Sequence, residues 1–449
     1  MWDALDPAVM LSAELAERTE AGYGVDDVEP DVRSALEGAD HDRIDRAHRL
    51  LEATEIRADW PFDEPSSLER IHHERPDTAP AAPRLALDDH AVRDRILAGW
   101  LGRCAGCNLG KPVEGWSRAR IRRYLELADA YPVTDYLPAI DTTDEDLTLN
   151  PCWPETTRGN VTCMARDDDI DYTILALHAV ESHGPEVGAD AIAGEWLDHL
   201  PFGQVYTAER VAYRNLVGGV PPPRSASHRN PYREWIGAQI RADMWGYIHP
   251  GDPVRASVAA FRDASISHTR NGIYGEMWVA ALIAASFVTD DVLAALEISL
   301  GSIPSRSRLT AAIRDVLELR ASDVGWEEAR DAIEARYGHY SGVHTINNAT
   351  LVAAALLWGD GDFSRSIGLA VEGGWDADCN GATAGSVFGV MHGTDALPGH
   401  WIEPLHDLVR SSVSGFDPSR VSDLATRTAE LVSANAIRPK REASTCGSS

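Results

Sequence analysis

The sequence has almost no lysine, few cysteines and no long apolar run. Only Lys111 and Lys440 are lysines, and all other basic residues are arginines. Six cysteines spread over 449 residues do not make a disulfide framework. The best apolar candidate, residues 277–288, is shorter than the roughly 18–20 residues that a membrane helix needs. The first residues also lack the basic start and apolar run of a secretory signal. These absences predict a protein without membrane segments, located in the reducing cytoplasm.

Basic residues are also scarce relative to acidic ones. The chain carries 70 acidic and 41 basic residues, which gives a formal net charge of −29. Such a surface repels phosphate backbones, and no basic stripe interrupts it, so we expect no nucleic-acid partner. The arginine-rich, lysine-poor composition fits either a GC-rich genome or adaptation to high salt, and neither bears on function. A hydrophobic fraction of 44% excludes a disordered protein.

Apolar residues recur mostly three or four positions apart, as Ile170 and Ile174 do, which is the spacing of a helix. The predicted fold class is therefore all-α, with many helices joined by loops that contain Gly and Pro. We expect residues 1–88 to form a helical extension followed by a Pro-rich strap. Residues 89–435 should form the main domain. Residues 436–449 are polar, and we expect a disordered tail there.

Three acids in a row open one of the most regular helical windows. Asp167, Asp168 and Asp169 precede an apolar helix that is expected to run to about residue 181. Capping of free backbone N–H groups accounts for one of these acids, or for two. A third carboxylate exceeds that need, and adjacent carboxylates repel one another unless a cation lies among them. The cluster therefore suggests a hard, oxygen-liganded cation, with helix capping as the alternative.

A second acidic pair precedes a second helix, far along the chain. Asp376 and Asp378 come directly after a Gly-Gly-Trp turn and are two residues apart, so both can point the same way. The helix that follows is rich in Gly, Ala and Ser, which lets a neighbour approach its backbone closely. Two acidic helix starts that face each other would supply four or more carboxylate oxygens, enough for one or two Mg²⁺ or Mn²⁺ ions.

A third segment combines small residues with an isolated acid. Residues 98–110 are rich in Gly, Ala and Cys and predict a helix buried against its neighbours. Cys104 and Cys107 form a C-x-x-C, but no second pair lies at zinc-finger spacing, so we interpret them as packing residues. The Gly-rich pattern is not a phosphate loop, because no G-x-x-x-x-G-K-[ST] occurs. Glu114 follows in a Pro-Val-Glu-Gly loop, where an ordinary exposed acid is the alternative to a site residue.

Taken in this order, the three segments resemble the ADP-ribosylglycohydrolase family. That family includes the enzymes that remove ADP-ribose from modified nitrogenase reductase. Its members begin with a Gly/Ala-rich helix near a Pro-Val-Glu segment, continue with a Thr-Asp-Asp-Thr-like motif and close with a Gly-Gly-x-Asp-x-Asp-Thr-Asn-like motif. Residues 373–380, Gly-Gly-Trp-Asp-Ala-Asp-Cys-Asn, are similar to a bacterial and archaeal branch. The likeness covers roughly residues 92–400.

The resemblance implies an orthogonal all-α bundle with a binuclear Mg²⁺ centre, Mn²⁺ being the other candidate ion. The metal ligands that it implies are Asp167, Asp168, Asp169, Asp376, Asp378 and Cys379. Asp167 and Cys379 stand where the family usually has threonines. A carboxylate is still a good ligand for a hard ion, whereas a soft thiol suits Mg²⁺ poorly. Either the backbone or water replaces the Cys379 thiol in the coordination, or the metal preference shifts.

The implied activity is hydrolysis of an N- or O-glycosidic bond to the ribose of ADP-ribose. The resemblance and the positions of the acids assign catalysis to Asp168, Asp169 and Glu114, and substrate contact to His268, Glu276, Trp375 and Asn380. Packing at a helix end is the alternative for His268, and a first-turn acid is the alternative for Glu276. The substrate would be an ADP-ribosylated protein or a ribosylated small molecule. Two other classes compete: a catalytically weak module that binds ADP-ribose or ribosides, and a helical scaffold whose acid clusters are coincidental.

Overall fold

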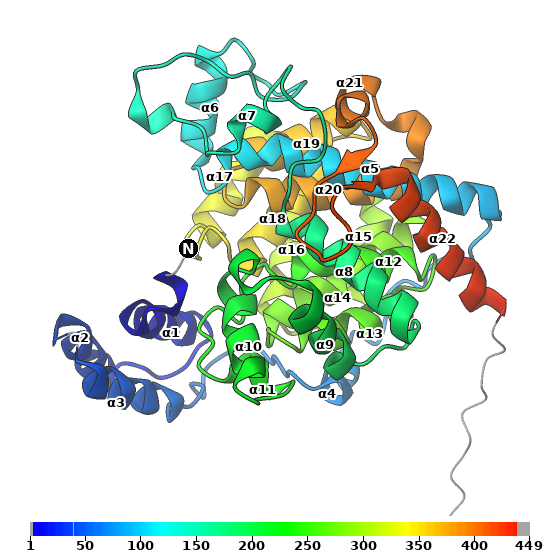
Figure 1. Ribbon diagram of the computed structural model, residues 1–449. Helices are drawn as coiled ribbons and strands as arrows, with labels where there is room; N and C mark the ends of the chain where they lie inside the picture. Colours follow the sequence, from blue (N-terminus) through cyan, green and yellow to red (C-terminus); the bar gives the residue numbers. More distant parts are fainter. Residues whose placement is uncertain (1–2, 39, 438–449) are drawn as a thin grey trace, which may run out of the picture.

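The computed structural model describes residues 3–38 and 40–437, and helices make up nearly all of its regular structure (Figure 1). Within those residues there are 22 α-helices and one antiparallel pair of two-residue strands, β1 (Leu408–Val409) and β2 (Ser419–Arg420). The all-α prediction is confirmed, because apolar residues at helical spacing dominate the sequence and few windows alternate. Within the part of the chain that is described, no helix is both long and apolar enough to span a bilayer.

The helices fall into an N-terminal group and a larger body. The N-terminal group consists of α1 (Pro7–Glu20), α2 (Glu29–Gly38), α3 (His41–Glu52) and α4 (Leu68–His73). The first half of the body consists of α5 (Asp89–Gly110), α6 (Arg118–Leu127), α7 (Trp153–Thr156), α8 (Asp168–His183), α9 (Ala189–His199), α10 (Thr207–Val217), α11 (Arg224–Ser227), α12 (Asp243–Tyr247) and α13 (Pro253–Ala264). The second half consists of α14 (Asn271–Ser286), α15 (Val292–Leu300), α16 (Arg308–Ala321), α17 (Trp326–Tyr337), α18 (Thr345–Trp358), α19 (Phe363–Glu372), α20 (Ala377–His392), α21 (Gly399–Ile402) and α22 (Val421–Ile437). Short 3₁₀ turns η1 (Asp3–Leu5), η2 (Lys111–Val113), η3 (Glu145–Leu147), η4 (Phe202–Gln204), η5 (Gln239–Arg241), η6 (Thr394–Ala396) and η7 (Glu403–Leu405) lie between them.

Helices α5 and α20 form the central pair of the body and touch backbone to backbone. A β-carbon at Gly102 would overlap the carbonyl oxygen of Gly385, and one at Gly389 would overlap that of Ala98. The contacts step four residues along each helix in opposite directions, so the two helices are antiparallel. Only residues without a side chain, or with a very small one, permit this approach. The expectation that small residues let a neighbour approach α20 closely is therefore met.

The antiparallel register decides where the acidic motifs lie. It brings Gly110, the last residue of α5, against Ala377, the first residue of α20. The loop after α5 therefore lies beside the start of α20, although more than 260 residues separate them in sequence. Helices α14 and α18, whose residues are all buried, pack on α20 and hold it in place. Helices that are apolar all round are expected inside a large core rather than at its surface.

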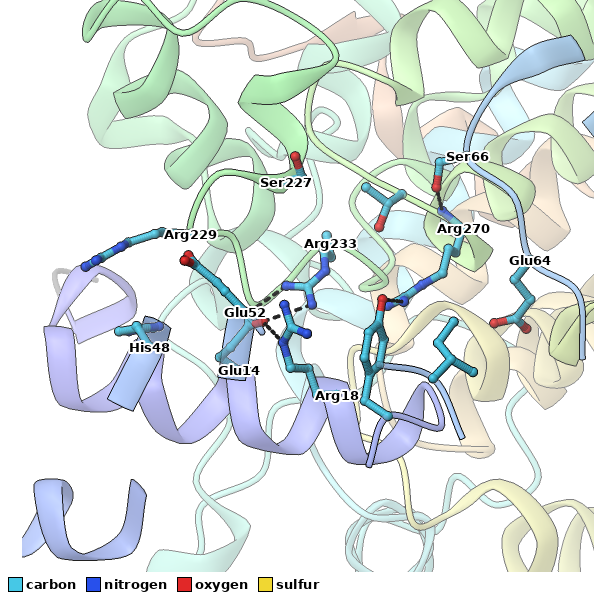
Figure 2. A pocket seen from close by; sticks show the side chains of 13 residues that line it. Glu14, Arg18, His48, Glu52, Glu64, Ser66, Ser227, Arg229, Arg233 and Arg270 are labelled. Atoms are coloured by element: carbon cyan, nitrogen blue, oxygen red, sulfur yellow. Dashed lines mark hydrogen bonds and ion pairs between the residues drawn. The ribbon is translucent and has the colours of Figure 1, made fainter. Parts of the chain in front are cut away.

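The N-terminal helices have a small core of their own and dock on the body through buried ion pairs. Leu11 on α1 and Leu51 on α3 belong to that core. Figure 2 shows Glu14 of α1 facing Arg233 of the body, and their side chains are 2.6 Å apart. Glu17, also on α1, pairs with Arg233 and with Arg270. These charges are almost fully buried, so each depends on its partner.

The Pro-rich strap crosses the body before α5 begins. Its Glu64 carboxylate is held 2.8 Å from the Arg308 guanidinium, and the carbonyl of Pro65 accepts a hydrogen bond from the Tyr274 hydroxyl. The structure adds one short helix to the strap, α4, whose Ile71 side chain is buried in the main core. At the other end, α22 includes residues 436 and 437, and the rest of the predicted tail lies outside the described residues.

Candidate active site

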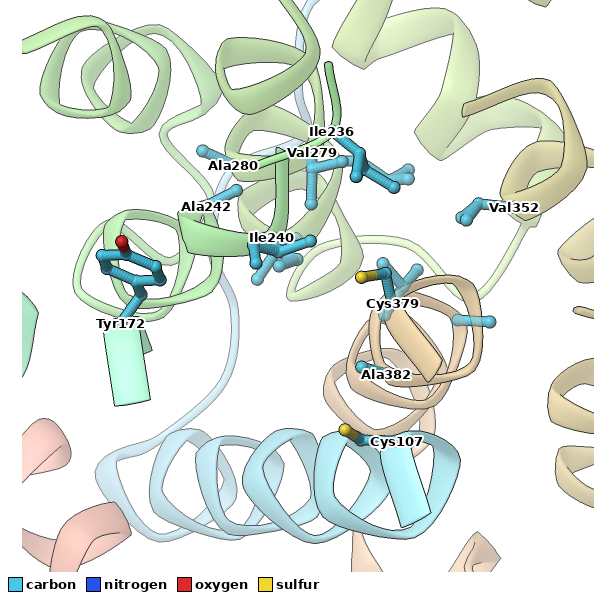
Figure 3. Close-up of a cluster of buried hydrophobic side chains, with 14 of the residues drawn as sticks. Cys107, Tyr172, Ile236, Ile240, Ala242, Val279, Ala280, Val352, Cys379 and Ala382 are labelled. Atoms are coloured by element: carbon cyan, nitrogen blue, oxygen red, sulfur yellow. The ribbon is translucent and has the colours of Figure 1, made fainter. Parts of the chain in front are cut away.

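A cavity of about 340 Å³ opens where the starts of α8 and α20 meet the end of α5. Its acidic side chains come from four separate stretches of sequence: the loop after α5, the start of α8, α10 and the start of α20. The residues that line it are Lys111, Glu114, Arg166, Asp167, Asp168, Tyr206, Thr207, Glu209, Trp235, Ile236, Gly237, Ile240, Val343, Asp376, Asp378 and Cys379. Figure 3 shows Cys379 on α20 next to α5, with Ile236 and Ile240 across from it. The cavity therefore has an acidic end and an apolar wall.

The start of α8 presents its three acids in three different ways. Asp167 is the N-cap residue, and its carboxylate accepts a 2.9 Å hydrogen bond from the backbone N–H of Asp169. One acid therefore caps the helix, as the capping alternative requires. Asp168 lies in the cavity wall, and Asp169 is buried beneath it. The carboxylates of Asp168 and Asp169 do not cap the helix and are thus available to bind a cation.

Arg103 of α5 fixes Asp169 from behind. Its guanidinium donates to the backbone carbonyl of Asp169 at 2.7 Å and lies 3.2 Å from the carboxylate. The same guanidinium pairs with Asp243 at 2.8 Å. From the other side, the Cys379 thiol donates to the second carboxylate oxygen of Asp169 at 3.1 Å. Burial raises the pKa of the Cys379 thiol well above its usual range, so the sulfur stays protonated and acts as a donor.

The start of α20 carries carboxylate oxygens without partners. Asp376 occupies the N-cap position, but its side chain makes no capping hydrogen bond. The Oδ1 atoms of Asp376 and Asp378 are buried and make no hydrogen bond to any residue that the structure describes. The preceding Trp375 adopts a left-handed φ of 61°, a conformation that costs free energy in a bulky residue. The strained turn holds Asp376 towards the cavity instead of letting it cap the helix.

The acidic motifs of α8 and α20 meet in space. Potential ligand atoms of Cys107, Asp167, Asp169 and Asp378 all lie within 4.8 Å of one another, and so do those of Asp376, Asp378 and Cys379. Buried, unpartnered carboxylate oxygens are costly unless a cation compensates them. The donor set is dominated by oxygen, which fits a hard divalent ion better than a soft one. The residues present therefore fit a metal centre.

The carboxyl pKa values show how crowded the charges are. Burial, together with repulsion from Asp167, raises the pKa of Asp378 to about 6. Burial and neighbouring carboxylates raise the pKa values of Asp168 and Asp376 well above their usual range. Burial also disfavours the charged form of Asp167, but the Lys111 ammonium outweighs it and lowers the pKa of that carboxyl. Asp169, another acid of the cluster, lies 3.2 Å from the Arg103 guanidinium.

Glu114 lies at the cavity rim and is exposed, whereas Lys111 reaches inward to Asp167. Repulsion from Asp378, followed by desolvation at the cavity wall, raises the pKa of Glu114 well above its usual range. Asn150 donates to the backbone carbonyls of Lys111 and Glu114 at 3.1 Å each, which fixes the loop after α5. The sequence-predicted site residue Glu114 thus shares the cavity with Asp168, Asp376 and Asp378.

None of the four expected substrate residues lines the cavity, and two of them, His268 and Glu276, are buried behind its wall. The Nδ1 atom of His268 is hydrogen-bonded to Ser267 at 2.8 Å. It also lies 3.9 Å from the carboxylate of Glu209, and Glu209 does line the cavity. Glu276 is fully buried in α14 and lies 3.6 Å from Arg241. Both side chains can act on the cavity only through another residue.

The other two expected substrate residues support the start of α20. The Asn380 side chain donates to Asn348 Oδ1 at 2.7 Å, and the same oxygen accepts from the backbone N–H of Asp376 at 3.2 Å. Trp375 packs under Arg330, 4.1 Å from the guanidinium to the ring centre. Neither residue lines the cavity, so the contacts observed for them hold the start of α20 in place. Substrate contact by either residue stays a prediction.

Several residues that line the cavity or lie beside it could not be identified from the sequence. Lys111 is the only lysine among the described residues, which was the available signal for it. Cys107, interpreted as a packing residue, is buried yet lies among the carboxylates of the cluster. Tyr206 and Trp235 reach the cavity from loops before α10 and before η5, and the three acidic or Gly-rich motifs include neither of them.

Comparison with known proteins identifies the enzyme class and the family of this chain. A sequence profile of ADP-ribosylglycohydrolases matches residues 88–436, so the chain is a glycosidic-bond hydrolase. It belongs to the ADP-ribosylglycohydrolase family, whose members typically depend on metal ions. No curated protein matches the sequence significantly. A solved structure described as an ADP-ribosylglycohydrolase-related protein complex is similar, with 20% identity, 77% of this chain and 99% of that chain covered, and a TM-score of 0.48.

Proposed function

We propose that this glycohydrolase cleaves an N- or O-glycosidic bond to the ribose of ADP-ribose, or of a ribosylated small molecule, with two Mg²⁺ ions. The observation that carries the proposal is the meeting of two acidic helix starts in one cavity, with unpartnered oxygens on Asp376 and Asp378. A cavity of about 340 Å³ falls in the range of small-molecule sites. It has room for a ribosyl group and part of what is attached to it.

The proposed metal ligands are the acids of the two helix starts: Asp167, Asp168, Asp169, Asp376 and Asp378. When bound, divalent ions supply positive charge that polarises the oxygens of sugar and water. Cys379 is an unsuitable ligand for Mg²⁺ while its thiol stays protonated and donates to Asp169. We therefore propose that Cys379 orients Asp169 and does not coordinate a hard ion itself.

The chain's own residues would position the reacting groups and move a proton. Arg103 and Cys379 hold Asp169 from two sides, so its orientation is fixed before substrate arrives. Asp168 and Glu114 both reach the cavity, and either carboxylate would accept the proton of the attacking water. By analogy with other glycosidases, the developing positive charge on the sugar would be stabilised by the surrounding carboxylates.

The apolar wall would hold the group attached to the ribose. Tyr206 and Trp235 present aromatic rings to the cavity, beside Ile236 and Ile240. Aromatic rings of this kind stack on sugars and bases. Arg166 lies at the same end, 3.1 Å from the Tyr206 hydroxyl, and would offset negative charge on a bound diphosphate.

The test is turnover of a substrate panel that contains ADP-ribosyl-arginine, ADP-ribosyl-serine and simple ribosides. Purified full-length protein should release free ADP-ribose or ribose from at least one of them with Mg²⁺, and chelation should stop the reaction. Asp376→Asn should lower kcat/KM roughly 100-fold or more, because it removes charge from the metal-binding end. Asp77→Asn, at an exposed position of the strap, is the matched control and should leave turnover unchanged. Binding of ADP-ribose without turnover of any substrate would favour the binding module instead.

A further inference from the structure

Three potential metal ligands converge at a second place, between α8 and α9. Glu195 and His199 lie four residues apart on α9, so they share one face of that helix. Helix α8 packs against α9 (Figure 1). His178 reaches the pair from α8. His178 Nε2 is 3.2 Å from His199 Nε2 and 3.3 Å from Glu195 Oε2, and the third edge, His199 Nε2 to Glu195 Oε2, is 3.4 Å.

Hydrogen bonding accounts for only one edge of this triangle, the edge between His178 Nε2 and His199 Nε2. The Oε2 atom of Glu195 is buried and accepts no hydrogen bond from any residue that the structure describes. Glu195 as a whole is only 9% exposed, so the carboxylate has left bulk water. Burying a carboxylate oxygen without a partner is costly. A positive charge inside the triangle would remove that cost.

The three edges have the length expected for zinc. Histidine nitrogens and carboxylate oxygens bind Zn²⁺ at about 2.0–2.1 Å in a tetrahedron, which places neighbouring ligand atoms about 3.3–3.4 Å apart. The observed edges of 3.2, 3.3 and 3.4 Å match that separation. We propose that His178, Glu195 and His199 form a Zn²⁺ site, with the fourth position open to water.

A fourth residue supports the carboxylate. His183, at the end of α8, lies 2.8 Å through Nε2 from the other Glu195 oxygen, Oε1. A partner on the oxygen that does not bind the metal fixes the orientation of the ligand. The His178 and His199 side chains are 26% and 31% exposed, so an ion can enter from solvent. His183 is therefore a positioning residue, and the site is accessible.

This site is distinct from the acidic cavity. Asp168 and His178 are ten residues apart on α8, or roughly 15 Å along the helix axis. The ligand chemistry also differs, because two imidazoles favour zinc whereas an all-carboxylate set favours magnesium. The ion would join α8 to α9 and, through the hydrogen bond from Ser414 N to the His199 carbonyl (2.9 Å), to the segment before α22. We therefore infer a structural role for it.

The site can be tested by zinc binding to full-length protein in excess Mg²⁺, which occupies the carboxylate-rich cavity. Zn²⁺ is titrated against a chromophoric chelator after all metal has been removed by dialysis. The expected result is one tightly bound Zn²⁺ per chain, with an X-ray absorption spectrum showing two imidazole nitrogens and an oxygen at about 2.0–2.1 Å. Failure to bind zinc under these conditions overturns the proposal.

Substitutions of single residues test whether the zinc ion binds between α8 and α9. His178→Ala and His199→Ala should weaken zinc binding more than 100-fold, and His183→Ala roughly 10- to 100-fold. His41→Ala, at an exposed position of α3, should bind zinc as the unaltered protein does, and so should Asp376→Asn. Glu195→Gln, which changes one charge and little volume, serves as the second ligand variant should an alanine variant fold poorly. Zinc affinity that stays unchanged in the ligand variants, or that is lost in Asp376→Asn, contradicts the proposal.

Discussion

A β-carbon on Gly106 would overlap the carbonyl oxygen of Gly381, because the backbones of α5 and α20 touch at this point. The same contact recurs one turn away at Gly102 and Gly385. It sets the antiparallel register of the two helices, and that register brings the loop after α5 to the acids that open α20. The geometry of the candidate active site therefore depends on residues that carry no functional group.

Gly106→Ala should destabilise the protein, because neither backbone can move without shifting a packed helix. Overpacking of this kind costs about 1–3 kcal/mol, and more where the neighbour is backbone. Gly194→Ala is the matched control, since Gly194 lies within α9 and an added methyl group meets nothing there. That variant should be neutral or slightly stabilising. Chemical denaturation measures both free energies of unfolding, and equal values for the two variants would contradict the packing argument.

Lys111→Met should make the stability of the protein more dependent on Mg²⁺. Lys111 is the cation that pairs with Asp167, and both side chains are mostly buried. Without the ammonium, Asp167 is left among other carboxylates, which should cost up to about 3 kcal/mol in chelator. Mg²⁺ should restore more of the melting temperature in this variant than in the unaltered protein. Lys111→Arg keeps the charge and is the control. An identical Mg²⁺ response in all three proteins would show that Lys111 does not offset this charge.

Mg²⁺ affinity should increase with pH. The pKa of Asp378 is raised to about 6 in the protein without an ion, so below that pH the ion must displace a proton from it. Above pH 6 this carboxyl is already ionised and the competition ends. Asp168 and Asp376, whose pKa values are raised well above their usual range, extend the dependence to higher pH. Calorimetry from pH 5 to 8, in buffers with different ionisation enthalpies, should detect released protons. A pH-independent affinity would refute the coupling.

The fold class and the acidic helix starts could be predicted from the sequence because both are local. Helical spacing of apolar residues marks α8, and the surplus of acids at its start exceeds what one cap needs. The contact between α5 and α20 could not be predicted, because small residues show that a close approach is tolerated but not which helix makes it. The register follows from tertiary packing alone.

The positions of single site residues were harder to predict. In the sequence, His268 follows one helical window and Glu276 opens another, yet the fold buries both behind the cavity. The position of Lys111 depends on the same antiparallel register. The zinc ligands come from two helices, and His178 shares no regular spacing with the Glu195 and His199 pair. The proximity of these three residues is visible only in the three-dimensional structure.

Arg233→Ala should loosen the N-terminal helices from the body. Arg233 pairs with Glu14 and Glu17 of α1, and these side chains are at most 8% exposed. Removing it leaves two buried carboxylates without their main cation, a change that typically costs 3–5 kcal/mol. Arg33→Ala removes an exposed pair with Glu29 within one helix, which is worth about 0.3–0.5 kcal/mol. Limited proteolysis and denaturation should separate the two variants, and similar small losses in both would contradict the docking role.

The most direct test of the central claim is the number of Mn²⁺ or Mg²⁺ ions bound to the unaltered protein, to Asp168→Asn and to Asp378→Asn. One substitution lies at the start of α8 and the other at the start of α20. If the two helix starts form one metal centre, the unaltered protein binds two ions outside the proposed zinc site, and either substitution alone weakens binding and lowers glycohydrolase turnover. Ion binding and turnover that survive either substitution unchanged would contradict the account.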